Sequence, residues 1–428
     1  MGAILSNETS RTGSASRMPE IRVPGLLTLA GLVAGLVCGA LLAHSPEMDS
    51  ALAIAGPVGS LWLQGLKMTI LPLVAGLLFT GIVETAAAAR AEAMAKRTMA
   101  FIFGSLAFSA FVGATVMPLL LSFSPPPEGV AVPGTQAPPQ VPGIGDFLLS
   151  IMPTNVVTSA ANDALLPVII FVALFAVASL RLDEAPRRQL ALLFEGMAGA
   201  MMVLIGWVLK VAPVGVFALG FSLAARSGVA AIGALAHYIV LVSACGAVFL
   251  LLAYPLAAVI ARKPLGRFAA AVLPAQVVAI STQSSLASLP TMLASCRRLG
   301  VATTTAEFVL PLAVTIFRAT SPAMNVGVVI YAAHLAGVEL HPGAIAAGVF
   351  VAFLTTFGSV SLPGTVSFIA STAPIAAAMG VPLWPLAVLV AVEMLPDIMR
   401  TVGNVTMDVA VTASVDISRQ SAPATTED

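Results

Sequence analysis

Long runs of apolar residues, separated by short polar connections, dominate the sequence from residue 24 onward. A helix needs about 20 predominantly apolar residues to cross the hydrocarbon core of a bilayer. Several runs are longer than this, so we expect tilted or kinked helices. The pattern predicts eight spans, at 24–43, 51–85, 97–123, 147–180, 189–224, 228–261, 300–335 and 381–415.

Two further apolar segments, 268–296 and 343–378, do not fit this pattern. Basic residues flank the first on both sides, so it cannot be a crossing helix with both ends in the cytoplasm; neither flank of the second carries Lys or Arg. Both contain Ser-Leu-Pro near the middle, at 288–290 and 361–363, and proline interrupts a helix. We predict two opposed re-entrant helical hairpins, typical of inverted repeats in transporters. The alternative is two kinked spans.

The composition supports a membrane protein. Only 9% of the 428 residues are charged and 58% are hydrophobic, whereas soluble domains carry about 25% charged residues. High hydrophobicity excludes a disordered chain, and a net charge of zero without a basic domain excludes a nucleic-acid binder. The three cysteines and four histidines form no metal or disulfide pattern. The fold class predicted is therefore an all-α polytopic membrane protein that binds no nucleic acid.

The basic residues occupy alternate connections between the apolar runs. The connections 44–50, 124–146 and 336–342 contain no Lys or Arg. Because cytoplasmic loops carry an excess of Lys and Arg, we expect both termini in the cytoplasm and the chain in the cell (inner) membrane. Residues 1–23 and 416–428 are then cytoplasmic tails, and 124–146 is an external Pro-rich loop.

The last predicted span carries an unusual stripe of polar residues. Glu393, Asp397, Arg400, Asn404 and Asp408 fall within an arc of about 80° on one helix face. Such a stripe must face protein or a water-filled cavity. One alternative is a structural salt-bridge network. The other is a binding site in which Arg400 clamps a carboxylate and Asp397 takes an ammonium group, so that the ligand is a zwitterion with an extra acid group.

The span before the second predicted hairpin is interrupted. Pro322 breaks the helix and frees backbone polar groups, and such breaks bind ions or substrates in transporters. Ser321, at this break, is a candidate substrate-binding residue. Arg318 is a cation near the middle of the membrane, and its alternative role is a structural counter-ion for Asp408 or Glu393.

Motifs throughout the chain after residue 24 resemble the dicarboxylate/amino acid:cation symporter family, which includes the glutamate/aspartate transporters. The resemblance is strongest in the last span and in the proline-containing motifs of the other spans. These motifs are Leu66-Lys67-Met68-Thr69-Ile70-Leu71-Pro72, Pro153-Thr154-Asn155, Leu166-Pro167, Ala212 to Ala218, Val309-Leu310-Pro311-Leu312, Leu362-Pro363-Gly364 and Asp397 to Asp408.

The resemblance implies a homotrimer in which each protomer works as an elevator. Residues 24–96 and 147–224 would form the scaffold and trimerisation elements. Residues 97–123 and 228–415, including both hairpins, would form the transport domain, with the second hairpin as a gate.

The resemblance also implies roles for individual residues. Arg400 would hold the side-chain carboxylate of the substrate and Asp397 its amino group, which favours aspartate or glutamate. Asp408, together with Asn404, matches a possible sodium site. The main carboxylate would be held by Asn404 and the hairpin tips, at Ser284, Ser285, Leu362, Pro363 and Gly364.

The sequence departs from the family at the seventh span. The family's Asn-Met-Asp-Gly-Thr motif is replaced by Phe317 to Ser321, so that Phe317 and Ala319 stand at sodium-liganding positions and Arg318 at the methionine. The third-span threonine of the same site matches Phe108. A fixed guanidinium at Arg318 would replace the charge of a bound cation. We therefore expect reduced or absent sodium coupling, with proton coupling or uncoupled exchange as alternatives.

These observations predict a secondary active transporter for acidic amino acids, aspartate or glutamate, rather than an enzyme or a channel. The alternative is a proton- or sodium-coupled symporter for C4-dicarboxylates or other carboxylates. The expected partners are the acidic substrate, the lipid bilayer and two further copies of the chain. No cofactor is expected apart from sodium or a proton as the coupling ion.

Overall fold

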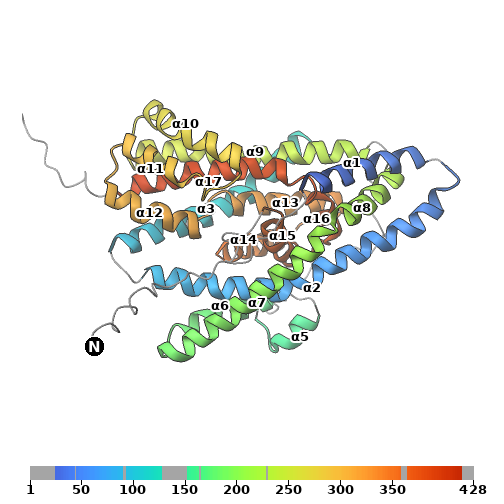
Figure 1. Cartoon of the computed structure of the whole chain (residues 1–428), viewed down its shortest axis with the longest axis horizontal. Helices are drawn as coiled ribbons and strands as arrows, with labels where there is room; N and C mark the ends of the chain where they lie inside the picture. The colour runs from blue at the N-terminus through green and yellow to red at the C-terminus, as the bar shows by residue number, and fades with distance from the viewer. Residues whose placement is uncertain are drawn as a thin grey trace, which may run out of the picture.

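The computed structural model describes residues 25–43, 45–89, 93–127, 152–162, 165–227, 230–357 and 364–416. The regular structure of these residues is entirely helical, as predicted (Figure 1). The helices before residue 260 are α1 (Gly25–Leu42), α2 (Met48–Ala89), α3 (Ala93–Phe123), α5 (Val156–Ala161), α6 (Leu165–Ser179), α7 (Glu184–Lys210), α8 (Ala212–Ser227) and α9 (Ala230–Val259).

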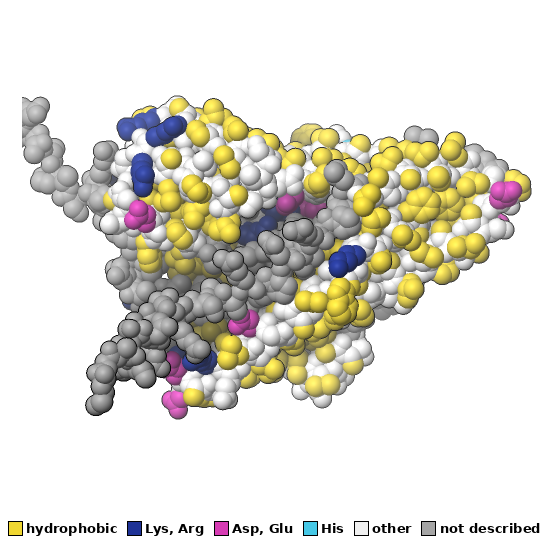
Figure 2. Space-filling view, in the orientation of Figure 1, with side chains coloured by type: hydrophobic (Ala, Val, Ile, Leu, Met, Phe, Trp, Pro, Cys, Tyr) yellow, Lys and Arg dark blue, Asp and Glu magenta, His cyan; other side chains and the backbone are white. Residues whose placement is uncertain are grey.

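The second part of the chain is divided into shorter helices. They are α10 (Leu265–Thr282), α11 (Leu289–Arg298), α12 (Thr303–Ile316), α13 (Ser321–Leu335), α14 (Pro342–Thr356), α15 (Gly364–Ala378), α16 (Trp384–Leu389) and α17 (Met394–Val415). Within the described part of the chain, five helices are long and apolar enough to cross a membrane, namely α2, α3, α7, α9 and α10. Figure 2 shows hydrophobic side chains scattered across the whole of the coloured surface, with few charged groups among them.

Besides the fourth span, which contains α5 and α6, three segments predicted as single spans are each two helices. The fifth span divides into α7 and α8 at Val211, the seventh into α12 and α13 at 317–320, and the last into α16 and α17 at 390–393. Prolines at 213, 322 and 396 lie in the first turn of the second helix in each pair. A proline ring clashes with the carbonyl four residues earlier, so the preceding helix ends there.

The helices around α2 lie along one side of the molecule. Figure 1 shows α2, α6 and α7 along the lower side, and α2 contacts α6, α7 and α8. The indole Nε1 of Trp62 donates to Val208 O at 3.0 Å. The rings of Phe79 and Phe194 stack with centroids 4.0 Å apart. These contacts fix α2 against α7.

Glycines let α1 approach α8 closely. Gly31, Gly35 and Gly39 repeat every four residues on α1, and a Cβ atom at any of them would collide with the backbone of α8. Helices in a bilayer associate through close van der Waals packing of this kind, because lipid is as apolar as their side chains.

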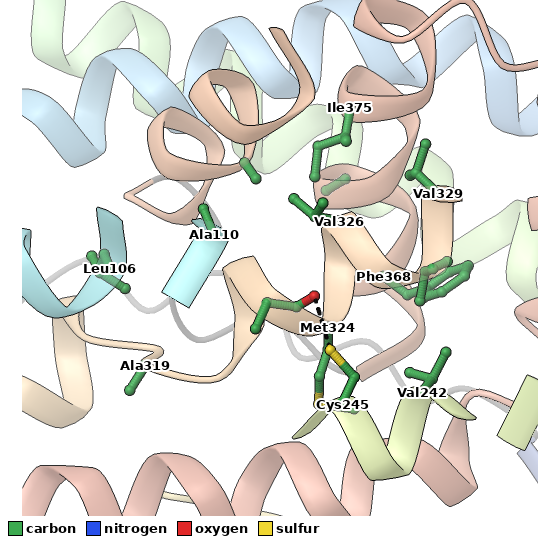
Figure 3. Close-up of a cluster of buried hydrophobic side chains, with 14 of the residues drawn as sticks. Leu106, Ala110, Val242, Cys245, Ala319, Met324, Val326, Val329, Phe368 and Ile375 are labelled. Atoms are coloured by element: carbon green, nitrogen blue, oxygen red, sulfur yellow. Dashed lines mark hydrogen bonds between the residues drawn. The ribbon is translucent and has the colours of Figure 1, made fainter. Parts of the chain in front are cut away.

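The second half of the chain packs around α13 and α17. Figure 1 shows α9, α10 and α17 along the upper side and α13 to α16 between the two sides. The cluster in Figure 3 joins α3, α9, α13 and α15 through buried side chains that include Met324 and Phe368. The thiol of Cys245 donates to Ala323 O at 3.7 Å, and Ala323 N donates to Ser109 Oγ at 3.1 Å. These bonds tie α9 and α3 to the first turn of α13.

The predicted hairpin segments are two helix pairs. Helices α10 and α11 contact each other, as do α14 and α15. The first pair is unequal, at 18 and 10 residues, and the second is equal, at 15 and 15. Residues 283–288 connect the first pair. Most of the tip of the second pair, including Leu362 and Pro363, lies outside the described residues.

Candidate functional site

The polar stripe of the last span is buried inside the protein. Glu393, Asp397, Arg400, Asn404 and Asp408 are each 7% exposed or less. Glu393 immediately precedes α17 and the other four lie on it. Charged side chains are almost never buried unless they are paired, so the partners of each group decide what the stripe can do.

Two carboxylates converge on one nitrogen of Arg400. Arg400 Nη1 donates to Asp397 Oδ1 at 2.7 Å and lies 2.5 Å from Glu393 Oε1, an ion-pair contact without hydrogen-bond geometry. Arg400 Nη2 lies 3.5 Å from Asn325 Oδ1, which is longer than a usual hydrogen bond. Both acids lie at Nη1, so the other two nitrogens of the guanidinium, Nη2 and Nε, have only a long contact or none.

Tyr238 holds Glu393 in this arrangement. Its hydroxyl donates to Glu393 Oε2 at 2.8 Å, and its side chain on α9 is fully buried. Its ring packs edge-on against Tyr331 of α13, with centroids 5.3 Å apart. The two oxygens of Glu393 therefore face different partners, and α9 fixes the position of the acid.

Some buried polar atoms in the site have no partner among the described residues. Arg400 Nε and Ser321 Oγ are both buried without a hydrogen bond. A buried donor without a partner costs about 1–3 kcal/mol. Arg400 presents two donors, Nε and the weakly bound Nη2, with the spacing that a carboxylate accepts bidentately. Their unmet hydrogen bonds point to an anionic ligand.

Asn404 connects α17 to the break between α12 and α13. Its Oδ1 accepts from Thr320 N at 2.9 Å and lies 2.7 Å from Thr320 Oγ1. Thr320 Oγ1 also lies 2.8 Å from Arg400 O. The unwound residues before α13 are thereby held against the middle of the polar stripe.

Arg318, in the same break, contacts a different element. Its Nη1 donates to Ser367 Oγ at 2.8 Å, and Ser367 lies on α15. Glu393, one of the two acids predicted as alternative partners of Arg318, pairs with Arg400, and the counter-ion role of Arg318 for Asp408 or Glu393 stays a prediction. The bond to Ser367 joins the α12–α13 break to the second helix pair.

Asp408 is the most isolated acid of the stripe. It is fully buried, and neither carboxylate oxygen has a hydrogen-bond partner among the described residues. A buried ionised carboxylate is costly unless it is paired or coordinates a metal. Asp408 therefore requires a bound cation or its own proton.

The predicted tip residues are not joined to this cluster by hydrogen bonds in the described part of the chain. Ser284 Oγ accepts from Ala287 N at 3.2 Å and Ser284 O accepts from Ser288 Oγ at 2.9 Å, so its bonds stay within the tip. Ser285 is partly buried beside it. Gly364 is the first residue of α15, and Leu362 and Pro363 lie outside the described residues.

Phe108, matched to the third-span threonine of the sodium site, lies on the exposed face of α3. It is 51% exposed, whereas the next residue, Ser109, is fully buried and accepts a hydrogen bond from Ala323 N. Sequence reasoning also missed Tyr238 and Ser367. The signal for Tyr238 is a hydroxyl in the apolar run of α9, but nothing in that run indicates which acid it contacts.

Comparison with known sequences gives a consistent result. The sequence model of one family, described as the sodium:dicarboxylate symporter family, matches residues 26–418. A proton/sodium-glutamate symport protein of Bacillus subtilis (strain 168) is 28% identical over 395 residues, covering 89% of this chain and 90% of that protein. A proton/glutamate-aspartate symporter of Escherichia coli (strain K12) is 26% identical and covers 88% of each chain.

A third relative carries a different substrate in its name. The C4-dicarboxylate transport protein of Rhodopseudomonas palustris (strain HaA2) is 25% identical over 406 residues, covering 93% of this chain and 88% of that protein. The chain is thus similar along nearly its whole length to transporters of two kinds of acidic substrate.

Proposed function

The chain belongs to the sodium:dicarboxylate symporter family, and on that premise we propose that it is a secondary active transporter for an acidic amino acid, aspartate or glutamate. The observation that carries this proposal is the half-satisfied guanidinium of Arg400, buried beside two acids with Nε unbonded. It suits a substrate carboxylate that binds at Nε and Nη2. The glutamate and glutamate-aspartate symporters named among the relatives favour the same substrates.

Asp397 supports an amino-acid substrate. Without a ligand it pairs with Arg400 at 2.7 Å. A substrate that carries both charges would replace this internal pair with two new ones, its carboxylate on Arg400 and its ammonium on Asp397. The exchange keeps Arg400, Asp397 and the two substrate groups that bind them paired, which a low-dielectric site requires. Asn404, Ser321 and the tips at Ser284, Ser285 and Leu362 to Gly364 would hold the remaining carboxylate.

A C4-dicarboxylate is the second candidate substrate. Arg318 and Arg400 supply two guanidinium groups around the α12–α13 break and α17, which suits two carboxylates. The relative named for C4-dicarboxylate transport favours this reading. If succinate binds with an affinity equal to that of aspartate, a C4-dicarboxylate becomes the preferred substrate assignment.

We propose that Arg318 takes the place of a coupling cation and weakens sodium dependence. Its guanidinium bonds Ser367 on α15, so a permanent charge sits between the break and the second helix pair. Asp408, buried without a hydrogen bond, is the remaining place for sodium or a proton, with Asn404 nearby on α17.

We also propose an elevator movement in a homotrimer of the cell membrane with cytoplasmic termini. Helices α1, α2 and α5 to α8 would be the scaffold, and α3 with α9 to α17 the mobile transport domain. The α10–α11 and α14–α15 pairs would be the opposed hairpins. The packing supports this division, since α17 packs on α9, α10 and α12, and α2 on α6, α7 and α8.

Titration calorimetry on the purified protein tests the substrate assignment. Aspartate, glutamate and succinate are titrated with and without sodium at several pH values. Arg400→Lys should weaken aspartate binding by roughly 10- to 100-fold, because a charge-assisted bidentate contact is lost. Arg226→Gln is the matched control, since Arg226 is an exposed arginine at the end of α8. Unchanged affinity in Arg400→Lys would refute the carboxylate role.

The coupling assignment needs a separate variant. Arg318→Met removes the fixed charge, so aspartate binding should become dependent on sodium, which the wild-type chain should bind weakly or not at all. Binding by the wild-type chain that requires more than one sodium ion per substrate would contradict the role given to Arg318.

A further inference from the structure

Four exposed arginines gather where α9 ends, α10 begins and α11 ends. They are Arg262, Arg267, Arg297 and Arg298. Figure 2 shows dark-blue side chains clustered at this end of the molecule, over the region that Figure 1 labels α10 and α11. Arg267 Nη2 donates to Arg298 O at 3.2 Å and so joins the open ends of the two helices. Segments 31 residues apart therefore form one surface, here called the arginine patch.

The positive charge of the arginine patch is poorly compensated. Among the described residues, Glu307 is the one acid that pairs with it, 4.0 Å from Arg297, and the two side chains are 58% and 63% exposed. An exposed ion pair at that distance contributes little to the free energy of folding, so it neutralises the patch only weakly. At the start of α7, by comparison, two acids, Asp183 and Glu184, stand near Arg187 and Arg188 in the sequence.

Arg262 occupies a position where glycine is the favoured residue. Its φ is 52°, in the left-handed region, and Lys263 N donates back to Ala257 O at 3.0 Å to close the end of α9. The ends of α11, α13 and α15 are closed in the same region by Gly300, Gly337 and Gly380, and the end of α10 by Gln283. A side chain with a Cβ atom is strained there. Strained residues that persist point to a function, and what Arg262 adds is an exposed charge.

Apolar side chains adjoin the arginine patch on the outer surface. Val259 is 75% exposed and Leu265 is 53% exposed, on either side of Arg262. Along α10, Leu273, Val277 and Ile280 continue the exposed apolar surface away from the arginines. A cationic patch beside an apolar stripe complements an amphiphile with an anionic head, and a free phosphate ion would leave the stripe unused.

We propose that the arginine patch binds the headgroup of an anionic phospholipid whose acyl chains lie along α10. Basic residues near a membrane surface attract anionic lipids, and the attraction falls as salt screens it. Because the patch lies on the half of the chain proposed above to move, bound lipid biases the position of that half. This last consequence rests on the proposed function, whereas lipid binding does not.

Native mass spectrometry of the detergent-purified full chain tests the proposal. The protein is mixed with equimolar phosphatidylglycerol and phosphatidylcholine of identical acyl chains, and the bound ratio is measured. The wild-type chain should prefer phosphatidylglycerol. Arg262→Gly should weaken that binding about fivefold, and the Arg297→Gln/Arg298→Gln pair more strongly. Inorganic phosphate should not displace the lipid, and displacement by phosphate would assign the patch to a free anion instead.

Two controls separate this proposal from its alternatives. Arg187→Gln/Arg188→Gln should leave the phosphatidylglycerol preference unchanged, and an equal loss there would mean non-specific charge attraction. Arg262→Gly should leave Tm unchanged or raise it, because the strain is relieved. A lower Tm with an unchanged preference for phosphatidylglycerol would mean that Arg262 stabilises the fold rather than binds lipid, and it would contradict the proposal. Aspartate titration on the same samples reports the proposed function independently.

Discussion

At the residue scale, the site is organised by how the hydrogen bonds of Arg400 are shared. Glu393 and Asp397 both lie at Nη1, whereas Nε has no partner and Nη2 has a long one. Tyr238 holds the other oxygen of Glu393 at 2.8 Å. The open edge of Arg400 is thus defined in part by Glu393 and Tyr238, which need not touch the substrate.

Replacing Tyr238 by Phe tests this positioning. The change leaves Glu393 Oε2 buried without a donor, which costs about 1–3 kcal/mol. We expect a lower Tm of the ligand-free protein and weaker aspartate binding by calorimetry. Tyr254→Phe is the control, because the Tyr254 hydroxyl accepts one longer bond, at 3.3 Å, from Gln276. Equal effects of the two substitutions would remove the special role of Tyr238.

At the element scale, the close approach of α1 and α8 depends on the absence of side chains. Gly31, Gly35 and Gly39 each face backbone atoms of α8 too closely for a Cβ atom. In an open helix interior, glycine is less favourable than alanine by roughly 0.5–1 kcal/mol. These glycines are retained by helix packing rather than by backbone conformation.

A pair of glycine substitutions checks this. Gly35→Ala should lower Tm, because the new methyl group forces α1 away from Phe217. Gly199→Ala in α7 meets no atom within 4 Å, so it should leave Tm unchanged or raise it slightly through helix propensity. The measurement is thermal unfolding of both variants in the same detergent. A stabilised Gly35→Ala protein would contradict the packing role of α1.

At the scale of the whole molecule, the two halves of the chain are built differently. In the first half, long helices are fixed by glycine and aromatic contacts. In the second, helices are broken at the site, and polar bonds between distant residues join the pieces, as between Thr320 and Asn404. A helix break leaves backbone N–H and C=O groups without partners inside the helix. A ligand that binds there can form hydrogen bonds with them and make the segment more ordered.

Hydrogen–deuterium exchange with and without saturating aspartate tests this contrast. Ligand protection should concentrate at the α12–α13 break, at α14–α15 and in the first turns of α17, because these elements surround Arg318 and Arg400. Helices α1, α2, α7 and α8 should be unaffected. Protection spread evenly over both halves would show that the ligand orders the molecule as a whole.

Hydropathy and helical period predict much of this structure from the sequence. The polar face of α17 follows from spacing alone, because a 3.6-residue period places Asp397, Arg400 and Asn404 together. The break at Pro322 follows from proline sterics. The division before α17 was missed although Pro396 gives the same signal. The roles of Tyr238 and Ser367 could not be predicted, because they depend on how α9 and α15 pack against other helices.

The role proposed for Arg318, a fixed charge in place of a coupling ion on a moving domain, has a consequence for the electrical behaviour of the protein. A bound ion crosses the membrane once in each cycle and is released, so its charge contributes to the net current. The charge of Arg318 is covalently attached and returns with the empty protein, so it cancels over a full cycle. Each elementary charge moved through 100 mV is worth about 2.3 kcal/mol. A guanidinium in place of an ion therefore supplies the positive charge that the site needs. Because this charge makes no net crossing of the membrane, the membrane potential cannot drive transport through it.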